Sequence, residues 1–251
     1  MRKLFITDLD GTALGGNYPV YARFPECFAS LLDELTVRGW NWAINSSWDI
    51  AGQWKLVQDS PVKSRPAYLI GEFGREIAQL RGGKPELLQP YCADQELRIR
   101  EFTLRKIIPL QEKLNRKFLP EKIHFYGHLF QYIARDETGM KAFAAKYEND
   151  PELRISSSER QIIVRPAFLD KGKAVREIMQ RERIKPEDIV TAGDEAVDLS
   201  MMTSDITLHP ICPANAAESV QTFVRNAGGK IAVKSFGAGI SEEMRLLLQG
   251  K

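Results

Sequence analysis

The sequence of 251 residues is poor in cysteine, with only Cys27, Cys92 and Cys212, and it contains no Cys-x-x-Cys pair. Such wide spacing argues against a disulfide framework and against a structural zinc site. We expect the three thiols to be small buried side chains in a protein of the reducing cytoplasm.

An excess of charge of either sign is also absent, since 35 Lys and Arg face 33 Asp and Glu, a net charge of +2. This balance gives no support to binding of nucleic acid or of a membrane surface. No apolar stretch is long enough to span a bilayer, and the first residues, MRKLFITDLD, turn acidic before a signal-peptide core could form. We therefore predict a cytoplasmic protein that binds neither nucleic acid nor membrane, as a monomer or a small homo-oligomer.

Short apolar runs alternate with helical patterns in the first and last thirds of the sequence. We expect strands at residues 3–7, 40–44, 67–70, 189–192, 206–208 and 230–233, and helices at residues 25–38, 50–57, 171–183, 196–202, 216–226 and 241–249. This alternation predicts an α/β fold with a doubly wound, Rossmann-like parallel sheet.

The middle third has a different pattern, which begins near Arg81-Gly82-Gly83-Lys84. A long helical stretch at 95–117, which Pro109 would kink or break, precedes strands at 122–126 and 129–134, a helix at 140–147, and strands at 153–156 and 161–164. Helices and antiparallel hairpins of this kind are typical of an α+β domain. We predict a core of residues 1–82 and 167–251 and an inserted α+β domain of residues 83–166.

Polar side chains follow several of the expected core strands. In a doubly wound sheet, ligands bind beyond the carboxyl ends of the strands, so these side chains should converge on one crevice. They are Asp8 and Asp10 after the first strand, Ser46 and Ser47 after the second, Asp194 and Asp198 after a later one, and Lys171 at a helix start. Carboxylate oxygens from separate loops suit Mg²⁺, and a lysine and a hydroxyl beside them suit a phosphoryl group.

Four segments in this order resemble the four motifs of the haloacid dehalogenase superfamily of phosphatases. They are Asp8-Leu9-Asp10-Gly11-Thr12, a serine after the second strand, Lys171, and Gly193-Asp194-Glu195-Ala196-Val197-Asp198. The inserted domain resembles the cap of the Cof-like, type IIB branch, which includes sugar-phosphate phosphatases and in which the cap governs substrate specificity.

The resemblance implies a role for each matching residue. Asp8 would be the nucleophile and Asp10 the general acid and base. Thr12, which would steady the loop, would belong with Ser46 and Lys171 to the phosphate-binding set. The register with the family pattern favours Ser46 over Ser47. The Mg²⁺ ligands would be Asp8, Asp10 through its backbone carbonyl, Asp194 and Asp198, and Asn215 would lie near the site.

Two positions depart from that pattern: Trp48 stands where relatives commonly have Arg, and Val197 where they often have Asn. The resemblance implies a Mg²⁺-dependent phosphatase that acts on a small phosphorylated metabolite, with a sugar phosphate as the leading class, through an aspartyl-phosphate intermediate. Two alternatives remain open. Ser46-Ser47-Trp48-Asp49 loosely resembles a segment of phosphomannomutases, which favours a phosphosugar mutase, and Trp48 and Val197 are compatible with a non-catalytic binding protein that retains the fold.

Overall fold

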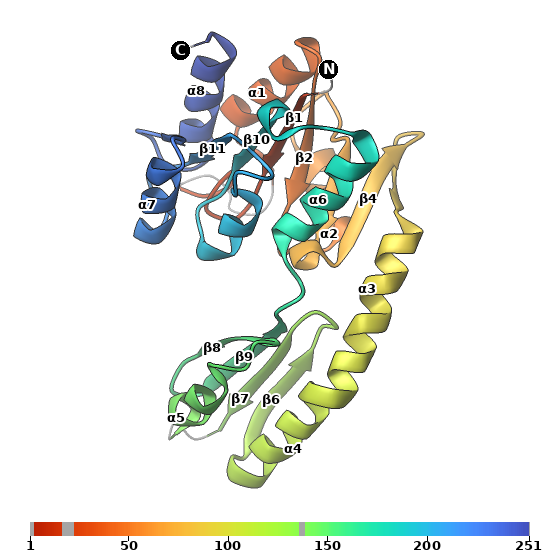
Figure 1. Cartoon of the computed structure of the whole chain (residues 1–251), viewed down its shortest axis with the longest axis vertical. Coiled ribbons are helices and arrows are strands. Elements are labelled where there is room, and N and C mark those ends of the chain that lie inside the picture. Colours follow the sequence, from red (N-terminus) through yellow and green to blue (C-terminus); the bar gives the residue numbers. More distant parts are fainter. Residues whose placement is uncertain (1–2, 17–22, 136–138, 251) are drawn as a thin grey trace. The chain divides into compact units, whose positions relative to one another are not determined.

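The computed structural model describes residues 3–16, 23–135 and 139–250, and it divides the chain into two compact units (Figure 1). The first unit comprises Met1–Leu88 and Asp170–Lys251, and the second comprises Gln89–Leu169. The sequence placed the insert at residues 83–166. The unit begins later than that because Lys84–Leu87 pairs with Glu76–Arg81 and so belongs to the sheet of the first unit.

The first unit is built on an eight-stranded sheet in the order β12-β11-β10-β1-β2-β3-β4-β5. The pairs from β12 to β3 are parallel, whereas β3–β4 and β4–β5 are antiparallel. The strands are β1 (Lys3–Thr7), β2 (Trp40–Asn45), β3 (Tyr68–Gly71), β4 (Glu76–Arg81), β5 (Lys84–Leu87), β10 (Ile189–Ala192), β11 (His209–Cys212) and β12 (Lys230–Ile231). The expected α/β class with a sheet of mainly parallel strands is confirmed.

Helices precede or follow the parallel strands of this sheet. They are α1 (Glu26–Val37), α2 (Ile50–Asp59), α6 (Lys171–Glu182), α7 (Glu218–Asn226) and α8 (Phe236–Leu248), with 3-10 turns at Glu72–Gly74, Pro186–Asp188 and Ala196–Met201. On β1, Phe5 packs in a buried cluster with Phe28 of α1 and Trp42 of β2, while Leu4 and Ile6, on the opposite face, are equally buried. Burial on both faces explains why this strand is a continuous apolar run, and each such side chain contributes about 1.5–3 kcal/mol.

The strand order reverses at β1. From this strand the chain builds β2 and β3 on one side, and later it builds β10, β11 and β12 on the other. The carboxyl end of β1 is therefore the topological switch point, where doubly wound sheets bind their ligands. Asp8 is the first residue beyond it.

The second unit contains a four-stranded antiparallel sheet in the order β6-β7-β9-β8. Its elements are α3 (Gln89–Phe102), α4 (Ile108–Lys117), β6 (Pro120–Phe125), β7 (Phe130–Ala134), α5 (Met140–Ala144), β8 (Leu153–Ser157) and β9 (Gln161–Pro166), with a 3-10 turn at Ala145–Tyr147. A π-helical turn at Thr103–Ile107 separates α3 from α4. Pro109 follows this turn and has no N–H to offer the carbonyl of Arg105, which accounts for the irregular hydrogen bonding there.

Several sequence predictions were wrong in detail. The strand expected at 206–208 lies instead at His209–Cys212. The sequence did not indicate a strand there because it contains Pro210, and proline is rare within strands. The final helix begins at Phe236, five residues before the prediction, since Gly237 and Gly239 lack side chains that would otherwise collide with the carbonyls of Ala13 and Lys234.

The expectation of three buried thiols holds only for Cys212, because Cys27 is exposed and Cys92 is half-buried. All three are free. Within the ranges that the structure describes, no helix combines the length and the apolar character needed to cross a membrane. The cytoplasmic location stays a prediction.

Candidate active site

The loop after β1 is held in place by hydrogen bonds to neighbouring segments. The N–H of Asp8 donates to the carbonyl of Ala192 on β10 at 2.9 Å, and the hydroxyl of Thr12 donates to Oδ1 of Asp194 at 2.7 Å. Gly11 has a φ of +79°, and a Cβ added there would lie 2.1 Å from Oδ2 of Asp194. The glycine is therefore required both for the turn and for the close approach of this carboxylate.

Lys171 begins α6, and its ammonium group is buried, with a residue exposure of 2%. Its Nζ donates to Oδ1 of Asp8 at 2.6 Å and to Oδ1 of Asp198 at 2.5 Å. The side chain of Asp170 caps the helix by accepting from the N–H of Lys173. Burial alone would lower the pKa of Lys171, but the carboxylates of Asp198 and Asp8 outweigh it and raise that pKa above its usual value. The lysine is thus a fixed positive charge between two acids.

Asp198 is fully buried in the 3-10 turn that follows β10. Its Oδ2 accepts from the N–H groups of Asp194 and Glu195, both at 3.0 Å, while its Oδ1 accepts from Lys171. A Cβ on Gly193 would collide with Asp198, at 2.4 Å from its Cβ. This carboxylate therefore shapes the loop and anchors the lysine.

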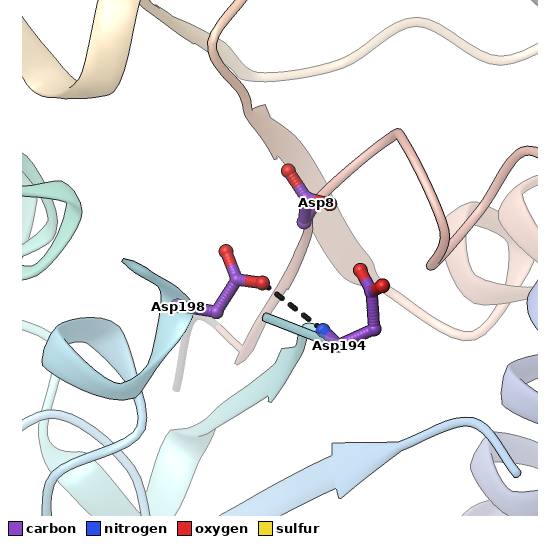
Figure 2. A group of neighbouring side chains, drawn as sticks. All are labelled: Asp8, Asp194 and Asp198. Carbon is purple, nitrogen blue, oxygen red and sulfur yellow. Dashed lines mark hydrogen bonds between the residues drawn. The ribbon is translucent and has the colours of Figure 1, made fainter. Parts of the chain in front are cut away.

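Oxygens of Asp8, Asp194 and Asp198 lie within 4.8 Å of one another, and all three residues are buried (Figure 2). Burial raises the pKa of Asp8 to about 8, with Asp198 adding to the effect and Lys171 opposing it. Burial likewise raises the pKa of Asp194 to about 6, and the hydrogen bond from Thr12 opposes this. Three carboxylates face one ammonium, so the cluster carries a deficit of positive charge that a cation would relieve.

The hydrogen bonds indicate which of these oxygens suit a cation. Among the described residues, no hydrogen bond reaches Oδ2 of Asp8 or Oδ2 of Asp194, whereas both oxygens of Asp198 already accept. A divalent ion that prefers oxygen ligands fits Asp8 and Asp194 best, with Asp198 behind them. The side chain of Asp10 does not belong to this cluster.

Asp10 lies two residues beyond Asp8 and is half-buried. The indole Nε1 of Trp48 donates to its Oδ2 at 2.9 Å, while its buried Oδ1 has no hydrogen-bond partner within the described part of the chain. Burial raises the pKa of Asp10, against the effects of the Trp48 hydrogen bond and of Lys171. The environment therefore favours the protonated carboxyl more than water does.

The two serines after β2 lie in different environments. Ser46 is fully buried, and its Oγ accepts from the N–H of Trp48 at 3.2 Å. Ser47 is half-buried and lines a cavity of about 170 Å³, which Ser46 does not. Thr12, expected with the phosphate-binding set, is also fully buried, and its hydroxyl donates to Asp194.

That cavity collects most of the expected site residues. Its lining consists of Asp8, Asp10, Ser47, Phe73, Lys171, Glu195, Val197 and Asp198. Sites that enclose a whole drug-sized ligand occupy about 300–1,000 Å³, so this cavity suits a phosphoryl group better than an entire sugar phosphate.

Asn215 has a clearer place than the sequence indicated. Its Nδ2 donates to the carbonyl of Gly11 at 2.8 Å, and its Oδ1 accepts from the N–H of Phe236 at 2.8 Å. The side chain thus ties the loop after β1 to the beginning of α8. The sequence showed only an Asn-Ala pair. The hydrogen-bond partners of Asn215 could not be recognised from it, because Gly11 and Phe236 lie far from Asn215 in the chain.

A family model described as haloacid dehalogenase-like hydrolase matches residues 89–230, more than half of the chain. The chain belongs to the haloacid dehalogenase-like hydrolase family. The resemblance found in the motifs is thus confirmed, and the expected enzyme class, a phosphoric monoester hydrolase, is supported by a relative named a phosphatase. That relative is the mannosylfructose-phosphate phosphatase of Agrobacterium fabrum (strain C58 / ATCC 33970), 28% identical over 203 residues, which are 79% of this chain and 78% of that protein.

Solved structures of the same fold include further members of this family. The sucrose-phosphatase from Synechocystis sp. PCC6803, solved with sucrose and phosphate, has a TM-score of 0.66 at 19% identity, and the match covers 96% of each chain. A haloacid dehalogenase-like hydrolase from B. subtilis has a TM-score of 0.63 at 15% identity, with 97% of this chain and 99% of that chain covered. At these identities the likeness establishes the fold.

Proposed function

We propose that the chain is a Mg²⁺-dependent phosphatase that hydrolyses a small sugar phosphate through a phosphoryl group held on Asp8. The observation that carries the proposal is the buried arrangement of Asp8, Lys171 and Asp198, in which one ammonium group contacts both carboxylates and more acidic oxygens remain than positive charges. A phosphate ester and a divalent cation bound together suit this imbalance, because the lysine and the cation offset the charge of the phosphate.

Asp8 and Asp194 would hold Mg²⁺, together with the backbone carbonyl of Asp10, and Asp198 would support them from behind. The ion would supply positive charge to the phosphate oxygens and keep the Asp8 carboxylate ionised. Lys171 would bind one phosphate oxygen, and the hydroxyl that does so beside it would come from Ser47, which lines the cavity, rather than from Ser46.

The reaction would proceed in two steps. In the first, a carboxylate oxygen of Asp8 forms a bond to phosphorus, the ester P–O bond breaks, and Asp10 gives its proton to the departing sugar oxygen. In the second, the Asp10 carboxylate takes a proton from a water molecule whose oxygen attacks phosphorus. Inorganic phosphate leaves, and the Asp8 carboxylate and the protonated Asp10 are restored.

The remainder of the substrate needs contacts beyond the small cavity. We propose that residues 89–169 act as the cap domain that recognises the sugar. Two relatives support this class of substrate by their names, one a mannosylfructose-phosphate phosphatase and the other a sucrose-phosphatase. The size of the cavity, which suits the phosphoryl end, also supports a second set of contacts.

The first experiment is release of phosphate from p-nitrophenyl phosphate, with Mg²⁺ and with a chelator. Native protein should turn over only with Mg²⁺, and Asp8→Asn should abolish turnover, whereas Asp59→Asn, a change at an exposed carboxylate, should not. Turnover that survives in Asp8→Asn would refute the assignment of the nucleophile. A panel of sugar phosphates then identifies the substrate, and recovery of free phosphate instead of an isomeric sugar phosphate distinguishes hydrolysis from the mutase alternative.

A further inference from the structure

Trp48 contacts the residue proposed as the general acid, although it stands where the family pattern has a different side chain. Its indole Nε1 donates to Oδ2 of Asp10 at 2.9 Å. No other hydrogen bond to the Asp10 carboxyl group is found among the described residues. Within the described part of the chain, this is the hydrogen bond that orients the carboxyl group.

Trp48 is itself firmly held. Its N–H donates to Oγ of Ser46 at 3.2 Å, and its carbonyl accepts from the N–H of Glu72 at 3.0 Å and from Nε2 of Gln53 at 2.9 Å. Its ring packs against the buried cluster of the first unit. An indole fixed on both its backbone and its ring can orient a partner without losing much conformational freedom at the moment of reaction.

The chemistry of the indole determines the direction of this hydrogen bond. The Nε1–H group is a donor only, so Oδ2 must act as the acceptor in this bond. A carboxyl oxygen can accept this bond in both the protonated and the ionised form of the group. The indole is also neutral, so it orients the acid without adding a charge to the site.

We propose that Trp48 is a positioning residue, which holds the Asp10 carboxyl group by Oδ2 for proton transfer to the leaving oxygen. This inference rests on the proposed phosphatase function. It extends that function by assigning the side chain that orients the general acid.

Leaving groups of different quality test the idea, because proton transfer matters most for a poor leaving group. Trp48→Phe keeps an aromatic ring and removes the N–H. We expect kcat for an alkyl phosphate such as a hexose 6-phosphate to fall about 10- to 100-fold, a part of the contribution usual for acid–base catalysis. With p-nitrophenyl phosphate, whose leaving group needs little protonation, kcat should change less than about threefold, and KM should stay similar for both esters.

Trp54→Phe is the matched control, since this partly buried indole packs against the same cluster and, among the described residues, the indole bonded to Asp10 is that of Trp48. It should affect both esters equally and slightly. A second measurement combines Trp48→Phe with Asp10→Asn. If Trp48 acts through Asp10, the tryptophan substitution should add no further loss in the double variant.

Equal losses of kcat on the two esters in Trp48→Phe, or an undiminished effect of this change in the Asp10→Asn background, would overturn the inference while leaving the phosphatase assignment intact. Absence of Mg²⁺-dependent turnover by the native protein on every ester would overturn the proposed function, and the inference with it. The two failures are therefore distinguishable within one set of assays.

Discussion

Replacing Lys171 with methionine tests whether this ammonium group neutralises the acidic cluster. Its Nζ lies 2.6 Å from Asp8 and 2.5 Å from Asp198, and the side chains of the first pair are only 3% and 8% exposed. Removing one partner of a buried ion pair typically costs about 3–5 kcal/mol, because the remaining charge is left uncompensated. Methionine has a similar length and no charge, so the loss should reflect the missing ammonium group rather than a cavity.

An exposed pair of the same length provides the control. Lys55 and Asp59 lie 2.7 Å apart, but their side chains are 75% and 47% exposed. Exposed pairs of this kind on a helix contribute about 0.3–0.5 kcal/mol, so Lys55→Met should lower the free energy of unfolding by no more than that. The difference between the two variants isolates the effect of burial.

Urea unfolding of metal-free protein at pH 8 and at pH 5 measures these free energies. The raised pKa keeps Lys171 charged throughout this range, so its stabilising contribution is not lost through its own titration. In Lys171→Met the carboxylates can take up protons at pH 5, which reduces the penalty, and the loss should therefore be larger at pH 8. A loss under about 0.5 kcal/mol at pH 8, equal to that of Lys55→Met, would refute the electrostatic reasoning.

Two further predictions concern the cation and the loop that would surround it. The pKa values of Asp8 and Asp194 are raised from 3.8 to about 8 and about 6. Between the unfolded and the folded pKa values, the folded state holds protons that the unfolded state has lost. Metal-free protein should therefore lose stability as the pH rises from about 4 to about 8. Mg²⁺ replaces those protons, so the increase in Tm that it produces over chelator, measured by thermal unfolding, should be larger at pH 8 than at pH 5.5; equal increases would contradict this. Gly11→Ala should cost about 1–3 kcal/mol and weaken Mg²⁺ binding in calorimetric titration, because its φ of +79° and the nearby Asp194 oxygen leave no room for a Cβ. Native stability and affinity in this variant would show that the loop tolerates a side chain.

The central strands could be predicted from the sequence because burial on both faces gives them unbroken apolar runs that end abruptly at polar residues. The expected strands at 3–7 and 189–192 coincide with β1 and β10. The convergence of Asp8, Lys171 and Asp198 followed from the same logic, since carboxyl ends of parallel strands meet at one edge of the sheet.

Other features of the fold and of the candidate site depend on contacts that a local sequence pattern does not reveal. The hairpin of β4 and β5 was missed because Gly82 and Gly83 suggested a domain boundary, whereas both adopt positive φ angles in a tight turn. The choice between Ser46 and Ser47 rests on a single position, and adjacent residues near a strand end face different surroundings. The bond from Trp48 to Asp10 joins residues 38 positions apart, and only the fold brings them together.

The division of the first unit into two stretches of sequence has a consequence for the order in which the chain can be completed during synthesis. The second unit is continuous, from Gln89 to Leu169, whereas β1 acquires its neighbour β10 only after residue 192 has been made. Asp8, at the end of β1, therefore lacks Lys171 and the backbone carbonyl of Ala192, its two partners in the finished protein, until residues 171 and 192 have been made. The candidate site is thus completed late in synthesis, and a chain interrupted between Gln89 and Leu169 lacks the ammonium group of Lys171.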